Sequence, residues 1–236
     1  MRLQPLLLIV LCLSSPSLFA HDYWLQAAGE DYHLHRGHRY SEHQGAKEVP
    51  FDPAIITATR CLSASDGSIQ TSRVSGSYPP LIKGPCQALL ISLDSGYWSQ
   101  TLTGTRNQPK NELFAVLRSW QALETVKRIE SWSPQLTRPL GDGFEIVFQE
   151  NPYPLNVGDK LRLTTLLNGQ PVAGAAVAYH GDARGVTDAE GHINIRIRHS
   201  GLQIVSASLE RALNTDKADK QVRSSVLMFN LKTESH

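Results

Sequence analysis

The sequence predicts a mainly β fold, in which two β-sandwich-like domains are joined by one amphipathic helix. Short apolar runs are separated by turn residues along most of the 236-residue chain, which contains 17 Gly and 13 Pro. In residues 193–198, apolar and polar side chains alternate strictly, as they do in a strand with one buried face. Between the two strand-rich halves, apolar residues recur instead at helical spacing.

Residues 1–20 are predicted to be a secretory signal peptide. Arg2 supplies a positive charge, residues 6–13 are apolar, and Ala20 precedes the expected cleavage site. The apolar run is shorter than the ~20 residues that a membrane-spanning helix needs. We therefore expect a periplasmic or secreted protein that begins at His21 and has no membrane span.

Residues 21–110 are predicted to form an N-terminal β domain clipped by a disulfide bond. Loss of the signal peptide leaves Cys61 and Cys86 as an even pair, which suits an oxidising compartment. Linking them would contribute roughly 3.5 kcal/mol by the chain-entropy argument, whereas their spacing is poor for a zinc site. The strands expected in this domain are Ile55–Leu62, Ile69–Val74 and Leu89–Leu93.

Residues 111–139 are predicted to be a helical linker. From Asn111, a possible N-cap, to Ser131, apolar residues recur at three-residue intervals, at Leu117, Trp120, Leu123 and Val126. Charged side chains would form the wet face of this helix, namely Arg118, Glu124, Lys127 and Arg128.

Residues 140–236 are predicted to form a C-terminal immunoglobulin-like or transthyretin-like β-sandwich. Turn residues at 168–171 join two strand candidates into a hairpin, and Gly191 can take a positive φ before the alternating strand. The expected strands are Phe144–Gln149, Lys160–Leu167, Val172–Tyr179, His192–Arg198, Leu202–Leu209 and Val222–Leu231.

Five of the nine histidines lie close together near the predicted start of the exported chain, at His21, His33, His35, His38 and His43. Neutral imidazole is a good ligand for nickel, cobalt, copper and zinc. On a strand, His33 and His35 project from the same face and could converge on one ion. His38 could fold back across Gly37 and His43 could complete the site, with Asp31 and Glu42 as oxygen ligands or as partners that orient a ring.

Two other interpretations of these histidines are open. If cleavage follows Ala20, the α-amine and the imidazole of His21 could chelate copper together as a histidine brace, completed by a further imidazole. Alternatively, the same histidines are solvated residues of a polar loop. His180, His192 and His199 stand beside glycine or at a strand end, and we interpret them as turn residues.

Composition and motifs exclude several classes of function. Loss of Arg2 with the signal peptide cancels the formal net charge of +1, so no nucleic-acid partner is expected. The chain contains neither G-x-S-x-G nor H-E-x-x-H, and it has no phosphate-binding glycine loop, so we expect no enzyme.

The pair Tyr97 and Trp98 suggests an exposed aromatic loop, which could serve a structural or adhesive module that binds a cell-envelope partner.

Two motifs carry a family resemblance. Residues 167–175 (LNGQPVAGA), followed by residues 187–191 (TDAEG), resemble the transthyretin-like, carboxypeptidase-regulatory-like β-sandwich modules. Together with residues 21–25 (HDYWL), they resemble a bacterial periplasmic family of unknown function associated with nickel and cobalt uptake. The resemblance implies nickel or cobalt as the ligand and a membrane transporter as a possible partner.

The sequence thus predicts a non-enzymatic periplasmic protein that binds a divalent transition metal for uptake or buffering. Nickel or cobalt is expected from the resemblance, while copper and zinc are chemically possible. The alternatives are a structural or adhesive module and a copper protein with an amino-terminal brace.

Overall fold

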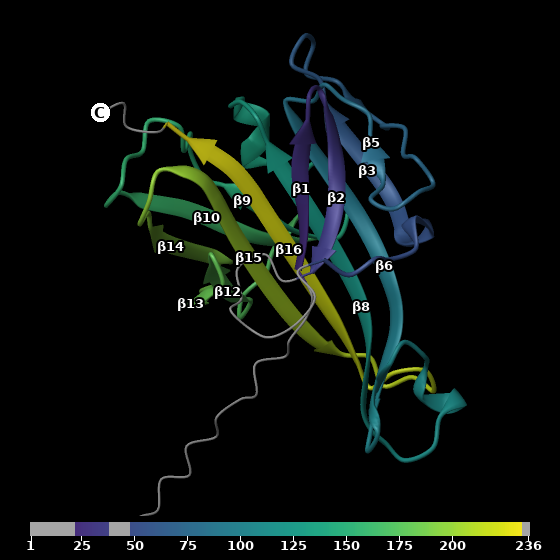
Figure 1. Cartoon of the computed structure of the whole chain (residues 1–236). Helices are drawn as coiled ribbons and strands as arrows, with labels where there is room; N and C mark the ends of the chain where they lie inside the picture. The colour runs from purple at the N-terminus through teal and green to yellow at the C-terminus, as the bar shows by residue number, and fades with distance from the viewer. Residues whose placement is uncertain (1–21, 38–47, 233–236) are drawn as a thin grey trace, which may run out of the picture.

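The computed structural model describes residues 22–37 and 48–232, and these residues confirm a mainly β protein with several sheets (Figure 1). Nine strands form the central sheet, in the order β13-β12-β15-β16-β8-β6-β3-β4, with β7 also paired to β6. Their bounds are β3 Ile56–Leu62, β4 Ile69–Gln70, β6 Ala88–Thr101, β7 Gly104–Arg106, β8 Val116–Ile129, β12 Ala176–Tyr179, β13 Asp182–Val186, β15 Gly201–Ala212 and β16 Lys220–Leu231.

Two smaller sheets cover the central sheet. The front sheet has the order β1-β2-β5, with β1 Asp22–Ala28, β2 Asp31–Gly37 and β5 Leu81–Ile82. Figure 1 shows β1 and β2 lying across the central sheet. In the back sheet, β10 pairs with each of the other three strands, whose bounds are β9 Phe144–Phe148, β11 Gln170–Pro171 and β14 His192–Arg196, while β10 itself covers Lys160–Leu167.

The central sheet is apolar on both faces, because each face packs against one of the smaller sheets. Successive side chains of a strand point to opposite faces, so Leu89 joins the front core while Leu90 joins the back core. In β16, Met228 and Phe229 divide in the same way. The two cores together account for most of the buried apolar side chains.

The pairing of β8 with β16 joins the two halves of the chain. These strands run parallel, with Val126 opposite Val226, whereas the other strand pairs of the described residues are antiparallel. Strands from both sides of residue 140, where the C-terminal domain was expected to begin, therefore share one sheet.

The helix predicted between the halves is wrong, since β8 occupies most of residues 111–131. In the described residues, the helical segments are short 3-10 turns at Pro53–Ile55, Lys110–Glu112 and Pro134–Thr137. β8 lies inside the central sheet between β6 and β16, so both of its faces are buried at one end, while Leu117 near the other end is exposed. This uneven burial removes the alternation that identifies a strand and leaves the three-residue spacing typical of a helix.

Local turn chemistry explains why most C-terminal strands lie near their predicted bounds. The strand expected at Val172–Tyr179 is an exception: it begins at Ala176 and pairs with β13, which was not predicted, and with β15 instead of forming a hairpin with β10. Asn168 and Gly169 have φ of 51° and 77°, which is the combination that a two-residue hairpin turn requires between β10 and β11. At Gly191, φ is 75° and an added Cβ would lie 2.7 Å from the Thr165 carbonyl oxygen. No side chain fits at position 191, so glycine is required there.

The predicted disulfide is confirmed. Cys61 and Cys86 are bonded with their Cα atoms 5.3 Å apart. The bond joins β3 to the segment that enters β6, and the loop it closes contains β4 and β5. Among the helical segments of the described residues, none has the length and apolar composition needed to cross a membrane.

Candidate functional site

Two of the five predicted metal ligands, His33 and His35, lie on β2 of the front sheet. His21, His38 and His43 lie outside the described residues, as does Glu42. β1 and β2 form a hairpin whose turn contains Gly29 at φ 67°. In β2, Tyr32 and Leu34 point into the front core, and the two histidines therefore point to the opposite face.

The rings of His33 and His35 are neighbours on that face. Their centroids are 6.1 Å apart and their planes are inclined by 63°. The expectation that a two-residue spacing on a strand brings these imidazoles together is confirmed.

Each of the two rings presents Nδ1 to an oxygen acceptor. His33 Nδ1 lies 3.3 Å from the Pro79 carbonyl oxygen. His35 Nδ1 lies 3.2 Å from Glu48 Oε2, close enough for an ion pair but not aligned as a hydrogen bond. The Pro79 carbonyl can only accept, so in neutral His33 the proton belongs on Nδ1 and the lone pair on Nε2. For His35, the nearby Glu48 carboxylate favours the same tautomer electrostatically. Histidines that bind metals through Nε2 are held by such acceptors.

His35 is buried although it points away from the central sheet. Its exposed fraction is 8%, and its ring stacks on Trp24 at a centroid distance of 5.4 Å and an angle of 12°. Within the described part of the chain, neither ring nitrogen of His35 makes a hydrogen bond. A buried polar atom without a partner costs about 1–3 kcal/mol, so a ligand on Nε2 would relieve a penalty that the fold already carries.

Glu48 and Pro79 were missed by the sequence analysis. Both come from outside the hairpin: Glu48 forms an isolated bridge with Gly37, and Pro79 precedes β5, the strand that pairs with β2. Tyr78 donates from its hydroxyl to Glu48 Oε2 at 3.4 Å, which ties the two segments together. No local pattern marks either residue, because tertiary contacts bring them to the histidines.

Asp31 is not oriented toward the histidines as a ligand would be. Its carboxylate accepts from Lys83 Nζ at 2.7 Å and from the Gly84 N–H at 3.0 Å. The hydrogen bond from Lys83 is the main cause of a lowered pKa of the Asp31 carboxyl. Across residues 22–37 and 48–232, no three His, Cys, Asp or Glu side chains gather closely enough to hold a metal.

A cluster of polar side chains around Glu124 lies between the β1–β2 hairpin and the central sheet. Glu124 accepts from Ser95 Oγ at 2.9 Å, and Ser95 Oγ is 3.2 Å from the Tyr23 hydroxyl. The Arg36 guanidinium lies 5.9 Å from the Tyr23 ring and 5.7 Å from the Trp98 ring. Burial raises the pKa of the Glu124 carboxyl to about 7, although Ser95 and Arg36 act in the opposite direction.

Glu124→Gln is expected to change how stability depends on pH. The ordinary pKa of this carboxyl is 4.5, so between about pH 4.5 and 7 the folded chain binds more protons than the unfolded chain. The free energy of unfolding therefore falls as pH rises through this window, by roughly 3 kcal/mol in total. Urea unfolding at pH 5 and pH 8 should show a smaller difference in the variant. Glu112→Gln, at an exposed position, should keep the wild-type difference, and an unchanged profile for Glu124→Gln would contradict the assignment.

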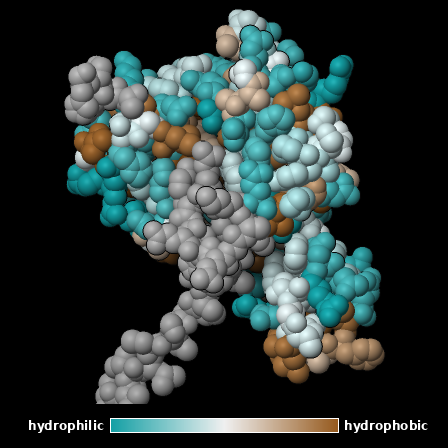
Figure 2. Space-filling model, viewed as in Figure 1, coloured by the Kyte–Doolittle hydropathy of each residue, from teal (hydrophilic) through white to brown (hydrophobic). Residues whose placement is uncertain are grey.

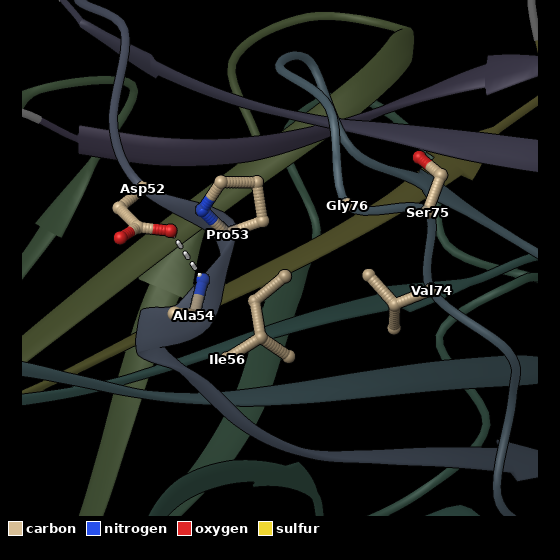
Figure 3. Close-up of a pocket in the computed structure, with 7 residues that line it drawn as sticks. All are labelled: Asp52, Pro53, Ala54, Ile56, Val74, Ser75 and Gly76. Carbon is tan, nitrogen blue, oxygen red and sulfur yellow. Dashed lines mark hydrogen bonds between the residues drawn. The ribbon is translucent and has the colours of Figure 1, made fainter.

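Two hollows of the surface offer no catalytic group. The larger, of about 340 Å³, is lined by Asp52, Pro53, Ala54, Ile56, Val74, Ser75 and Gly76 (Figure 3). Its two polar side chains serve the backbone: Asp52 Oδ1 accepts from the Ala54 N–H at 2.9 Å, and Ser75 Oγ accepts from the Leu81 N–H at 2.8 Å. The smaller hollow lies at the far end of β6 and is mainly apolar.

The other aromatic and histidine residues singled out in the sequence make contacts within the protein itself. Tyr97 and Trp98 lie within β6, so the expectation of an exposed aromatic loop is wrong. Trp98 donates from Nε1 to the Ser95 carbonyl at 3.0 Å. His199 stacks on Tyr179 with centroids 5.3 Å apart, and His180 Nε2 accepts from the Ile204 N–H at 3.2 Å.

Comparison with known proteins identifies a family without an assigned activity. Residues 18–211 match the model of a family described as a domain of unknown function, DUF4198. No curated protein and no solved structure matches the chain at a significant level. The match begins before β1 and ends within β15, so it includes the β1–β2 hairpin and strands of all three sheets. The chain belongs to the DUF4198 family.

Proposed function

We propose that the protein is an exported binding protein for a divalent transition-metal ion, which it holds through Nε2 of His33 and His35. The observation that carries this proposal is the pairing of the two rings on one face, each with Nδ1 within 3.3 Å of an oxygen acceptor. Acceptors of this kind fix the ring and raise the basicity of the other nitrogen.

The ring geometry supports a shared ion. Metal–nitrogen bonds of about 2.0–2.1 Å place the centroids of two imidazoles on a tetrahedral ion about 5 Å apart. The observed 6.1 Å between His33 and His35 is about 1 Å longer, so the two rings would have to move closer together to share one ion. Glu48 would orient His35, as carboxylates do in metal sites, without itself having to bind the ion.

Two imidazoles do not complete a site by themselves, so further ligands are required. Asp22 and Gly37 are register partners at one end of the hairpin, and the predicted ligands His21 and His38 are the next residues along the chain in each direction. Their participation, and that of His43, stays a prediction.

The resemblance that the sequence carries favours nickel or cobalt, delivered to a membrane transporter or buffered in the periplasm. Affinity order alone favours copper at a nitrogen-rich site, and zinc also accepts imidazole. The transthyretin-like assignment of the C-terminal strands belongs to the same resemblance and stays a prediction.

The experiment is a calorimetric titration of the chain from residue 21 with Ni²⁺, Co²⁺, Cu²⁺ and Zn²⁺. The double variant His33→Ala and His35→Ala should weaken binding of the preferred ion at least 100-fold. Glu48→Gln should weaken it about tenfold or more, since loss of an orienting partner typically has this effect. His192→Ala, at an exposed histidine on β14, is the matched control and should bind as the wild type does. Absence of binding for all four ions, or wild-type binding by the double variant, would refute the proposal.

A further inference from the structure

Residues 99–118 form an arm that extends away from the two cores. The arm comprises the end of β6, β7, the 3-10 turn Lys110–Glu112 and the start of β8. In Figure 1 these segments lie at the lower right, and in Figure 2 they form a separate lobe on which hydrophobic residues gather at the outer end.

The outer end of the arm is unusually apolar for an exposed surface. Of the six large hydrophobic side chains exposed in the described residues, three belong to the arm: Leu102 at 79%, Phe114 at 96% and Leu117 at 61%. Leu102 and Phe114 line a shared hollow of about 280 Å³ together with Leu113. We call Leu102, Leu113, Phe114 and Leu117 the apolar tip. Clustered exposed apolar side chains mark interaction sites more often than scattered ones do.

Hydrogen bonds hold the arm in this exposed position. Asn107 Nδ2 donates to the carbonyls of Ser95 and Tyr97 at 2.9 and 3.0 Å, and Ser99 Oγ donates to the Gln108 carbonyl at 2.8 Å. The apolar tip is therefore presented by an ordered hairpin.

A second set of contacts fixes the arm to the loop between β15 and β16. The Asp219 carboxylate accepts from Ser119 Oγ at 2.7 Å and pairs with Lys110 Nζ at 2.5 Å. Both ends of the arm are thus tied to the rest of the molecule, and the tip cannot reach a core without breaking these contacts.

The charge of the arm indicates what the tip binds. Its four charged residues are Arg106, Lys110, Glu112 and Arg118, so three of the four are cationic. Lys110 is paired with Asp219, and Arg118 Nε donates to Gln100 Oε1, while neither Arg106 nor Arg118 forms an ion pair with any described residue. Two guanidinium groups beside a protruding apolar tip match the interface of an anionic lipid bilayer, in which apolar side chains enter the acyl boundary and cations meet the headgroups.

We propose that the apolar tip docks the protein on an anionic lipid bilayer by inserting Phe114 and Leu102, while Arg106 and Arg118 meet the headgroups. A protein partner would need a groove shaped to a projecting tip, whereas a bilayer adapts to it. This inference is independent of the proposed metal site. The arm extends from β6 and β8 of the central sheet, whereas His33 and His35 lie on the face of the front sheet that points away from the central sheet.

The test is co-sedimentation of the purified chain with vesicles, in EDTA to exclude bound metal. Vesicles of phosphatidylcholine with about one-third phosphatidylglycerol should bind the protein at least tenfold more tightly than phosphatidylcholine alone, since clustered cations attract anionic lipid. The double variant Leu102→Ser and Phe114→Ser should lose at least tenfold in binding, as expected when buried apolar area is removed. Arg106→Gln with Arg118→Gln should remove the preference for anionic lipid.

Val186→Ser is the matched control, because Val186 is 65% exposed on β13, away from the arm, and should bind as the wild type does. Equal thermal stability of all variants would show that they fold. The proposal is overturned if the wild type ignores anionic vesicles or if the tip variant binds them equally. Self-association that depends on Phe114, without vesicle binding, would assign the tip to a second copy of the chain instead.

Discussion

Lys127→Met is expected to lower the free energy of unfolding by about 3–5 kcal/mol, because it leaves a buried carboxylate without its counter-charge. Lys127 and Glu145 are each 1% exposed, and Lys127 Nζ lies 2.7 Å from Glu145 Oε1. The pair sits between the central and back sheets, where Lys127 is opposite Leu90 and Leu227 in the neighbouring strands.

The backbone keeps Glu145 in place when its partner is lost. The Leu140 N–H donates to both carboxylate oxygens, at 3.0 and 3.1 Å, and the Gly141 N–H donates to Oε2 at 3.3 Å. The carboxylate therefore cannot turn toward water without giving up these bonds as well. In the variant, the charge must either stay desolvated or take up a proton, and both outcomes cost stability.

Urea unfolding monitored by tryptophan fluorescence at pH 7 measures the effect. Lys220→Met is the control, since Lys220 pairs with Glu210 at 2.5 Å but both side chains are partly exposed, and such a pair contributes about 1 kcal/mol or less. A loss below about 1 kcal/mol for Lys127→Met would show that this pair behaves like a surface pair.

Lys127 also shows where sequence analysis fails. It was assigned to the wet face of a helix, and it is among the most buried side chains of the molecule. A lysine in the centre of a sheet is acceptable only because its ammonium pairs with the Glu145 carboxylate, which the Leu140 and Gly141 N–H groups hold in place. No feature of the sequence near position 127 indicates that a carboxylate from β9 will lie beside Lys127. The helix predicted in place of β8 and the exposed position predicted for Lys127 are wrong for the same reason, because burial by distant segments is not marked in the local sequence.

Most C-terminal strands were predicted well because their information is local, although β13 was missed and β12 lies in the central sheet instead of pairing with β10. β10 matches its expected bounds, and β14 shows the alternation expected of a strand with one wet face. The turns between strands are set by residues such as Asn168 and Gly169, whose conformational preferences act within a few positions.

In the candidate site, too, the features set by local sequence were predicted and those set by tertiary contacts were not. The closeness of His33 and His35 follows from their two-residue spacing on a strand, and was predicted. The acceptors that orient the two rings come from Glu48 and Pro79, and were not. Each lies on a segment that folding brings to β2, so only the three-dimensional structure reveals it.

Replacing both Cys61 and Cys86 with Ala is expected to lower the free energy of unfolding by about 3.5 kcal/mol, the loop-closure entropy of the unfolded chain. Cys86 is buried, so alanine is preferred to serine because it places no hydroxyl in the front core. Urea unfolding of the double variant, compared with oxidised and fully reduced wild type, measures the cross-link itself. Equal stability of the oxidised and reduced wild type would contradict the expectation.

The same bond also affects the candidate site at His33 and His35, because the loop it closes holds β2 in place. Within this loop, Leu81 pairs with His33, the Pro80 carbonyl accepts from the Leu34 N–H at 3.1 Å, and the Pro79 carbonyl faces His33 Nδ1. Opening the loop frees these contacts before the central sheet unfolds, so hydrogen exchange should rise first at residues 81–83. If the proposed function holds, opening the loop also lowers the affinity for the metal. A protein kept in a reducing compartment would then lose much of its capacity to bind metal while keeping its fold. Unchanged hydrogen exchange at residues 81–83 in the double variant would show that the disulfide does not hold this segment against β2.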